Sequence, residues 1–295
     1  MQIANPRGVI DTLADGFRVL NRRPWLLIVP LCLDLFLWLG PEITADGVSA
    51  SLVRENPDFE GVAKALADVN LLGIAAWRFS SAVGVVRLDD TGGLDIGNAL
   101  GFASVILGCV VAGLALFSLF YAGVARALES GQRRDAFAAS AWRGFVRLSA
   151  FWALMLGAAT IAMLTVAVLA LAGPVGEVLA GLFMLAAGVT ALVAWLMFYM
   201  VQPAIFLGDR GARPAMRESA EFVRANFGPT FRLFGLVLVI TVGTGIAWQG
   251  IVESGAGALI AILGNAYIVT GLAVSVPLFY LDRRGLAAPV PAAAN

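Results

Sequence analysis

Long apolar runs at 98–124, 148–172, 178–206 and 256–280 contain no charged residue at all. A helix needs about 20 apolar residues to cross the hydrocarbon of a bilayer, so each run is long enough for one crossing. The chain as a whole is 60% hydrophobic and 14% charged, whereas a soluble domain carries about 25% charged residues. The runs therefore predict an all-α integral membrane protein.

Two weaker apolar stretches complete a set of six predicted transmembrane helices. The first helix covers 24–40 and the fifth covers 231–248. The first is read as a retained helix and not as a signal peptide, because Asp34 interrupts it and a cleavage-like site lies too far beyond it. Residues 1–23 are predicted to form an amphipathic helix in the cytoplasmic interface. Its apolar face is expected to contact acyl chains and consists of Val9, Ile10, Leu13, Phe17 and Leu20.

The distribution of basic residues predicts the topology. With the N-terminus inside, sixteen of the twenty Arg and Lys residues lie in cytoplasmic segments and four lie in the exported segment 41–97. This bias is the positive-inside pattern, and it places the tail 281–295 in the cytoplasm as well. A seventh crossing at 71–86 would put the 125–147 loop outside, against the charge bias. We therefore interpret 71–86 as an interfacial or re-entrant segment and 98–280 as the other five membrane helices.

The two long cytoplasmic loops indicate an internal repeat. Phe120-Tyr121 and Phe198-Tyr199 each lie near the end of a predicted membrane helix. The loops then share the pattern Ala-(Phe or Met)-x-x-Ser-Ala, at Ala136 to Ala141 and at Ala215 to Ala220, and its serine lies about twenty residues after the tyrosine in each case. The N-terminal helix resembles a degenerate third copy. The repeat predicts a unit of one interfacial helix followed by a membrane helix, used three times.

A family resemblance follows from the segment 214–228, PAMRESAEFVRANFG, and from the first helix at 30–41, PLCLDLFLWLGP. Both resemble an uncharacterised bacterial superfamily of six-helix membrane domains, which includes the membrane domain that precedes some glycerophosphodiester phosphodiesterases. The resemblance covers most of the helical part and implies the bacterial cytoplasmic membrane as the location. The soluble phosphodiesterase domain has no counterpart here, so the resemblance implies no catalysis, and it does not account for 41–97.

Asp34 is the one acidic residue inside a predicted membrane core. An ionisable group at that depth costs several kcal/mol unless it is paired, hydrated or protonated. Asn265 in the last helix is expected at about the same depth. The two residues predict either a structural hydrogen bond between the first and last helices or a proton or ion site.

Arginines border the predicted membrane helices on the cytoplasmic side. We predict contacts with lipid phosphates for the six that lie at the starts of the odd-numbered helices: Arg22, Arg23, Arg143, Arg147, Arg224 and Arg232. Membrane lipids and other membrane protein subunits are the expected partners. The net charge of zero gives no general attraction to nucleic acid.

The sequence gives no sign of an enzyme or of a bound cofactor. Histidine is absent, which removes the commonest ligand of metals and haem. Cys32 and Cys109 lie in separate apolar runs and are expected to be inert thiols. The acidic turn at 89–95 lacks the spacing of an EF-hand. The preferred hypothesis is a non-enzymatic accessory or scaffold subunit, and the alternative is a small pseudo-symmetric permease with Asp34 in its path.

Overall fold

The computed structural model describes residues 7–55, 60–67, 69–77, 79, 81, 93–128, 136–252 and 255–285. The first third contains α1 (Val9–Arg22), the 3₁₀ helix η1 (Pro24–Leu27), α2 (Ile28–Leu39), β1 (Ile43–Thr44), α3 (Asp46–Glu55), α4 (Glu60–Ala67), the 3₁₀ helix η3 (Leu71–Ala76) and β2 (Leu94–Asp95). The remainder contains α5 (Ala99–Leu128), α6 (Phe137–Ala170), α7 (Gly173–Met197), α8 (Val201–Phe206), α9 (Ala212–Ala225), α10 (Phe227–Gln249) and α11 (Gly255–Arg283).

Five of these helices are long and apolar enough to cross a membrane: α5, α6, α7, α10 and α11. The prediction of an all-α protein with several membrane helices is confirmed at this level. The apolar stretch Pro24–Leu39 is shorter, because η1 and α2 together measure about 26 Å against about 30 Å of hydrocarbon. By length alone the structure therefore supports five crossings with a sixth, shorter helix beside them.

The predicted limits of the third and fourth helices are wrong. The segment expected to span 178–206 is broken, since α7 ends at Met197 and α8 begins at Val201. Pro203 explains the break, because it has no N–H for the carbonyl of Tyr199 and its ring would clash with that carbonyl in a continuous helix. The hairpin turn also comes earlier than expected, at Gly173, where the positive φ of 77° suits glycine.

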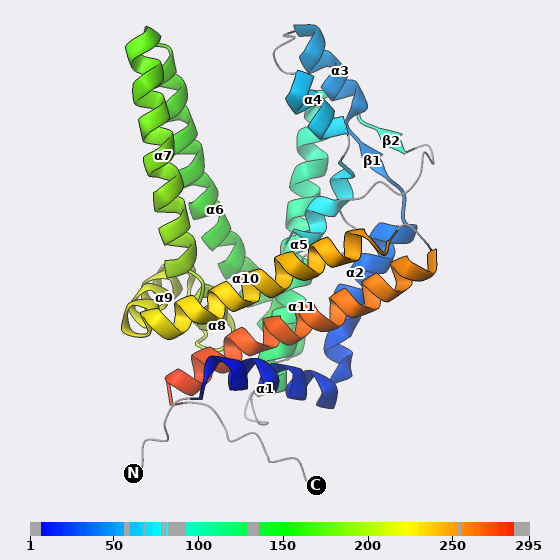
Figure 1. Cartoon of the computed structure of the whole chain (residues 1–295), viewed down its shortest axis with the longest axis vertical. Coiled ribbons are helices and arrows are strands. Elements are labelled where there is room, and N and C mark those ends of the chain that lie inside the picture. The colour runs from blue at the N-terminus through cyan, green and yellow to red at the C-terminus, as the bar shows by residue number, and fades with distance from the viewer. Residues whose placement is uncertain are drawn as a thin grey trace.

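The membrane helices meet at one end and diverge from it (Figure 1). We call the packed end the hub: it comprises α1, α8, α9, the last turns of α5 and α11, and the first turns of α6 and α10. The largest buried apolar cluster lies here and includes Leu20, Phe120, Ile205, Val223 and Phe279. The apolar runs suggest a six-helix bundle, whereas in the structure the helices join at their base and diverge from it.

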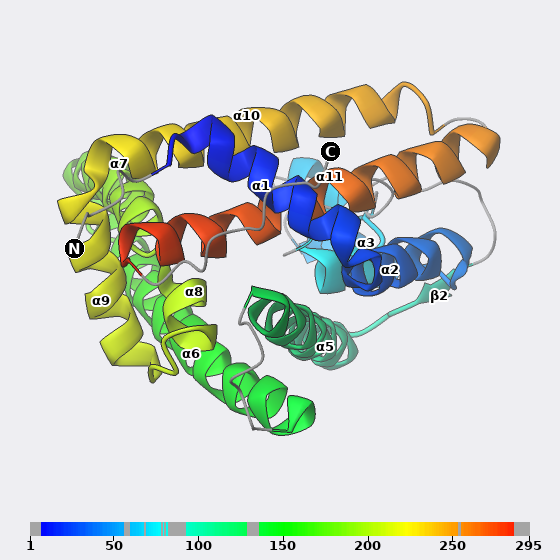
Figure 2. The same ribbon diagram turned by 90° about the horizontal axis from the view of Figure 1, so that it is seen from below.

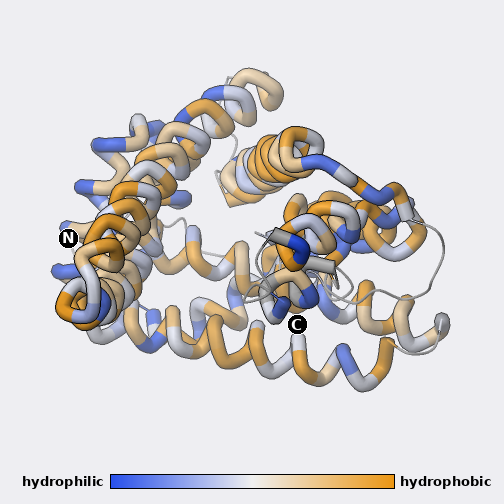
Figure 3. The backbone as a smooth tube through the Cα atoms, turned by 90° about the horizontal axis from the view of Figure 1, so that it is seen from above, coloured by the Kyte–Doolittle hydropathy of each residue, from blue (hydrophilic) through white to orange (hydrophobic). Residues whose placement is uncertain are grey.

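The helix α6 is buried only near the hub. The buried residues of α6 all lie in its first fifteen positions, ending at Phe151. Beyond them the hairpin exposes large apolar side chains on both helices, and its tube is predominantly apolar in colour (Figure 3). By contrast, more than half of the most apolar 18-residue stretch of α11 is buried, so α11 is the central helix of the fold.

The described part of 41–97, the segment predicted to be exported, lies at the far end of α5 from the hub and contains a short parallel pair of strands, in which Ile43 pairs with Leu94. Its η3 rests on α5. Gly113 allows this approach, because a Cβ there would lie 2.5 Å from the carbonyl oxygen of Ala75. Phe79 continues along α5 and packs against the ring of Phe117. The described part of 71–86 therefore lies beside a membrane helix. Of the acidic turn at 89–95, residues 89–92 lie outside the described residues.

The apolar face of α1 covers protein and not lipid, contrary to expectation. Leu13 and Leu20 are buried, and Gly16 lies directly against α11. The reason is the small surface that α11 presents there, because Gly271 and Ser275 let the two backbones approach closely. Of the predicted apolar face only Ile10 is largely exposed.

Candidate functional site

The hub contains three amphipathic stretches, and each packs on the end of a membrane helix that lies at the hub. The stretch at the start of α6 packs on α5, α9 packs on α8 and the end of α7, and α1 packs on α11. Each stretch then leads into the next membrane helix along the chain. Because α1 comes first in the sequence but packs on the last helix, the three contacts close a ring.

The helices α1 and α9 match in detail. Each has 14 residues and follows a glycine N-cap in extended conformation, Gly8 with φ −63° and Gly211 with φ −67°. Each ends at a residue with similar backbone angles, Arg23 at φ −136° and Asn226 at φ −124°. The match extends to chemistry: an arginine precedes each N-cap, and an acidic residue lies eight positions after that arginine.

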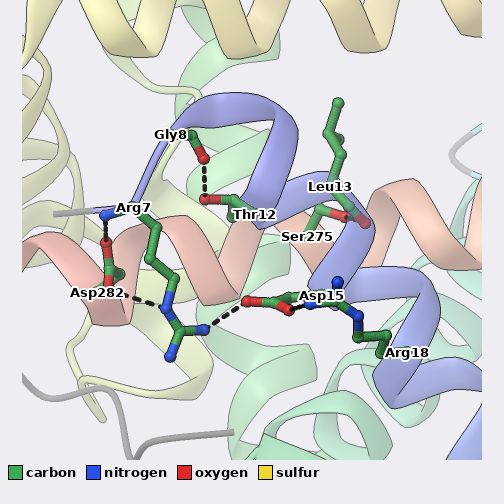
Figure 4. Close-up of polar contacts among 8 residues, drawn as sticks. All are labelled: Arg7, Gly8, Thr12, Leu13, Asp15, Arg18, Ser275 and Asp282. Carbon is green, nitrogen blue, oxygen red and sulfur yellow. Dashed lines mark hydrogen bonds and ion pairs between the residues drawn. The ribbon is translucent and has the colours of Figure 1, made fainter. Parts of the chain in front are cut away.

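Asp15 is the acidic residue of α1, and it is 4% exposed. Its carboxylate accepts a hydrogen bond from Arg7 at 2.5 Å and forms an ion pair with Arg18 on the same helix. The backbone N–H of Arg7 donates to Asp282 of α11 at 2.9 Å, as Figure 4 shows. The Arg7 segment thereby ties the start of α1 to the last turn of α11.

Glu218 is the equivalent acidic residue of α9. Arg210 donates to it from before the helix, with 3.0 Å between Nε and Oε2, as Arg7 does to Asp15. The hydroxyl of Tyr280 also donates to Glu218, and Arg284 lies 2.7 Å from the same carboxylate. The last turn of α11 is therefore held from one side by α1 and from the other by α9 (Figure 2).

A third Phe-Tyr pair, Phe279-Tyr280, lies near the C-terminal end of α11 and was missed by the sequence analysis. Both side chains are 1% exposed, and both rings pack against Phe222 of α9. The pair was overlooked because its interfacial helix is α1, at the opposite end of the sequence. A search for a circularly permuted repeat would have found it, together with the matching Arg-Gly pairs before α1 and α9.

The six arginines predicted to bind lipid phosphate all lie at the hub, where they differ in environment. Arg22, Arg224 and Arg232 are exposed, whereas Arg23, Arg143 and Arg147 are half-buried. Arg147 forms an ion pair with Asp209, so its charge already has a partner. Arg23 donates to the carbonyl of Arg126 at 3.3 Å.

Another exposed arginine of the hub is Arg217 on α9. Its hydrogen bond to Glu221, reinforced by the charge of that carboxylate, raises the pKa of Arg217 above its usual value. Arg217 therefore stays protonated throughout the physiological pH range.

Exposed aromatic side chains accompany the arginines at each junction between an amphipathic stretch and a membrane helix. Trp25 follows α1 and is 45% exposed, and Trp142 near the start of α6 is 65% exposed. Phe227 and Phe231 at the start of α10 stack on each other. Aromatic rings beside basic residues are typical of helix ends at the membrane–water interface.

The predicted polar pair lies between α2 and α11. The amide nitrogen of Asn265 is 3.4 Å from a carboxylate oxygen of Asp34, and both residues are nearly fully buried, at 3% and 2% exposure. The distance is at the long end for a hydrogen bond. The arrangement can fix α2 against α11, and it keeps the carboxyl away from lipid.

In the described ranges no three His, Cys, Asp or Glu side chains gather in a group that could hold a metal ion. Both cysteines are free thiols, Cys32 exposed and Cys109 buried. The expectations of no cofactor and no catalysis stay predictions.

No protein-family model, curated protein or solved structure matches the chain. The resemblance to the membrane domain of the phosphodiesterases stays a prediction.

Proposed function

We propose that this protein is a non-enzymatic scaffold subunit of the bacterial cytoplasmic membrane, which binds another membrane protein through the α6–α7 hairpin. In this proposal six helices cross the membrane, the short α2 included, and the hub faces the cytoplasm with both termini. The described arginines of all four predicted cytoplasmic segments lie on hub elements, which supports this orientation.

The observation that carries the proposal is the uncovered surface of α6 and α7. Within α7 the described buried residues are Gly176 and Ala180, near the turn that joins α6 to α7. Only 6% of the most apolar 18-residue stretch of α7 is buried. Lipid can cover any apolar helix, so exposure alone does not require a partner. Gly181 and Gly188 add the second feature: they lie seven residues apart on one face of α7, and a Cβ at either would meet nothing within 4 Å. Open small residues at helical spacing favour close approach of another helix.

A photo-crosslinking amino acid at Leu185 tests this proposal in whole cells. Leu185 is 68% exposed and lies beside Gly188 on α7. We expect one discrete adduct with another membrane protein, and we expect Gly188→Leu to lower its yield severalfold because the bulky side chain keeps the partner helix away.

The matched control is Gly243→Leu in α10, where the glycine is also exposed and a Cβ would also meet open space. It should leave the yield at Leu185 unchanged. Adducts with lipid alone, or equal yields in both leucine variants, would contradict the scaffold proposal.

The buried carboxyl of Asp34 favours a second candidate function, a small permease. If Asp34 is structural, Asp34→Asn should keep most of the thermal stability, since an amide can also bond to Asn265. Asp34→Leu should cost about 0.6–2 kcal/mol, the range for polar contacts between membrane helices. Thermal unfolding of the purified variants measures both effects.

Flux measurements in proteoliposomes separate the two functions. The scaffold proposal expects no pH-dependent flux in the wild type. A flux that is present in the wild type and lost in a stably folded Asp34→Asn variant would establish the permease and overturn the scaffold.

A further inference from the structure

We propose that the junction of α1, η1 and the C-terminal end of α5 binds the phosphate group of an anionic phospholipid. The site consists of Arg23, Trp25 and Arg126. This inference goes beyond the docking of a partner on α6–α7, and it requires only that the hub lie at the level of lipid headgroups.

Arg23 is held in place by the end of α5. Its guanidinium donates to the carbonyl of Arg126 at 3.3 Å, and Arg126 lies in the last turn of that helix. The last four carbonyls of a helix have no partner within it, so this bond satisfies one of them. Because the bond uses one of the five N–H groups of the guanidinium, the other four stay available to bind an anion.

Arg126 adds a second positive charge at the same end of α5. Its side chain is exposed, and Arg23 is half-buried beside its backbone. In the part of the chain that the structure describes, neither guanidinium forms an ion pair with a carboxylate. Two neighbouring cations of this kind attract a phosphate, which arginine binds through paired hydrogen bonds.

Trp25 sets the depth of the site. Its ring packs over Gly123, where a Cβ would lie 3.0 Å from the indole. Because glycine has no side chain, the indole can lie against α5. The next residue, Leu26, is buried in the hub, while Trp25 remains 45% exposed. Exposed tryptophan at a helix end lies at the headgroup level. The two arginines are therefore placed at the depth of lipid phosphates.

The other two junctions are less suited to hold a phosphate. In the α6 junction the charge of Arg147 is already paired with Asp209. In the α9–α10 junction Arg224 and Arg232 lie on different helices, and among the described residues no hydrogen bond fixes either guanidinium. The α1–α5 junction combines an anchored arginine, Arg23, with a second, exposed arginine, Arg126.

Native mass spectrometry of the purified full-length protein tests the site. Delipidated protein receives equal amounts of phosphatidylglycerol and phosphatidylcholine, and the bound lipid is counted. We expect the wild type to retain phosphatidylglycerol preferentially. Each arginine near an anionic surface contributes about 1 kcal/mol, so Arg126→Gln should weaken this binding about fivefold and Arg23→Gln with Arg126→Gln about 25-fold.

Controls separate lipid binding from a structural role and from free phosphate. Arg213→Gln with Arg217→Gln, which removes two exposed arginines of α9, should leave the preference intact. Equal retention of both lipids by the wild type would overturn the proposal. So would an Arg23→Gln variant with a lower thermal midpoint but an unchanged lipid preference, because Arg23 would then only cap α5. Complete displacement of phosphatidylglycerol by millimolar inorganic phosphate would assign the site to free phosphate instead.

The lipid test and the crosslinking test fail independently. Loss of the partner adduct at Leu185 leaves the lipid preference untouched, and loss of the preference leaves the adduct untouched.

Discussion

Alanine at position 16 is expected to destabilise the protein by about 1–3 kcal/mol, although alanine is the better helix former. A Cβ at Gly16 would lie 2.0 Å from the hydroxyl oxygen of Ser275 and 2.7 Å from the carbonyl oxygen of Gly271. The hydroxyl can rotate away, but the carbonyl belongs to the backbone of α11, so α1 must move. Gly16→Leu should detach α1 from the hub. Thermal unfolding of the purified protein in detergent measures the loss.

Gly157→Ala in α6 is the matched control, because a Cβ there would meet nothing within 4 Å. It should leave the thermal midpoint unchanged or raise it slightly. A Gly16→Ala variant that is as stable as Gly157→Ala would mean that α1 does not pack on α11 as described. The contact matters because it closes the ring of amphipathic stretches that forms the hub.

The long membrane helices could be predicted from the sequence because lipid imposes a simple rule. A run without charge that is long enough to cross the bilayer must be helical, since its backbone has no other partner for hydrogen bonds. This rule located the cores of α5, α6, α7, α10 and α11. The rule predicted the ends of these helices less accurately. In α6, for example, the amphipathic first part and the membrane helix form one continuous helix.

The break between α7 and α8 was missed although its cause is visible in the sequence. Pro203 lies inside the run predicted as one helix. The structure supplies what the sequence could not: Ser219 of α9 donates to the carbonyl of Met197 at 2.7 Å and accepts from the N–H of Met200 at 3.1 Å. The break is therefore compensated by a side chain from a distant helix, which also fixes α9 on the hub.

The divergence of the hairpins could not be predicted, for a physical reason. An apolar side chain such as Leu182 is equally suited to face lipid, a partner or another helix of the same chain. Periodicity therefore identifies a buried face only where the other face is polar. The same ambiguity explains why the apolar face of α1 was assigned to lipid and lies instead on α11.

The candidate site was predicted in part. Asp34 and Asn265 were paired from their expected depth, and the structure puts their polar atoms 3.4 Å apart. The junction arginines were located from charge, but their partners depend on the tertiary fold. Asp15 and Glu218 were not singled out, because one acidic residue in an amphipathic helix looks like part of a solvated face. Their equivalence becomes clear once Phe279-Tyr280 is recognised as the third repeat.

The topology of the hub is the central claim, and impermeant maleimide labelling of intact cells tests it most directly. Single cysteines are introduced at three exposed positions, Ser51 in α3, Ala138 in α6 and Arg213 in α9, after both native cysteines are replaced by alanine. Labels at Ser130 and Asp58 would test the same topology, but both residues lie outside the described part of the chain.

We predict that Ser51→Cys reacts from outside, and that Ala138→Cys and Arg213→Cys react only after the cytoplasmic membrane is permeabilised. The effect should be all-or-none, because six crossings place α3 and the hub on opposite sides of the bilayer. Labelling of Ala138→Cys in intact cells would contradict the account, since it would require another crossing between α3 and α6 and would separate the elements of the hub.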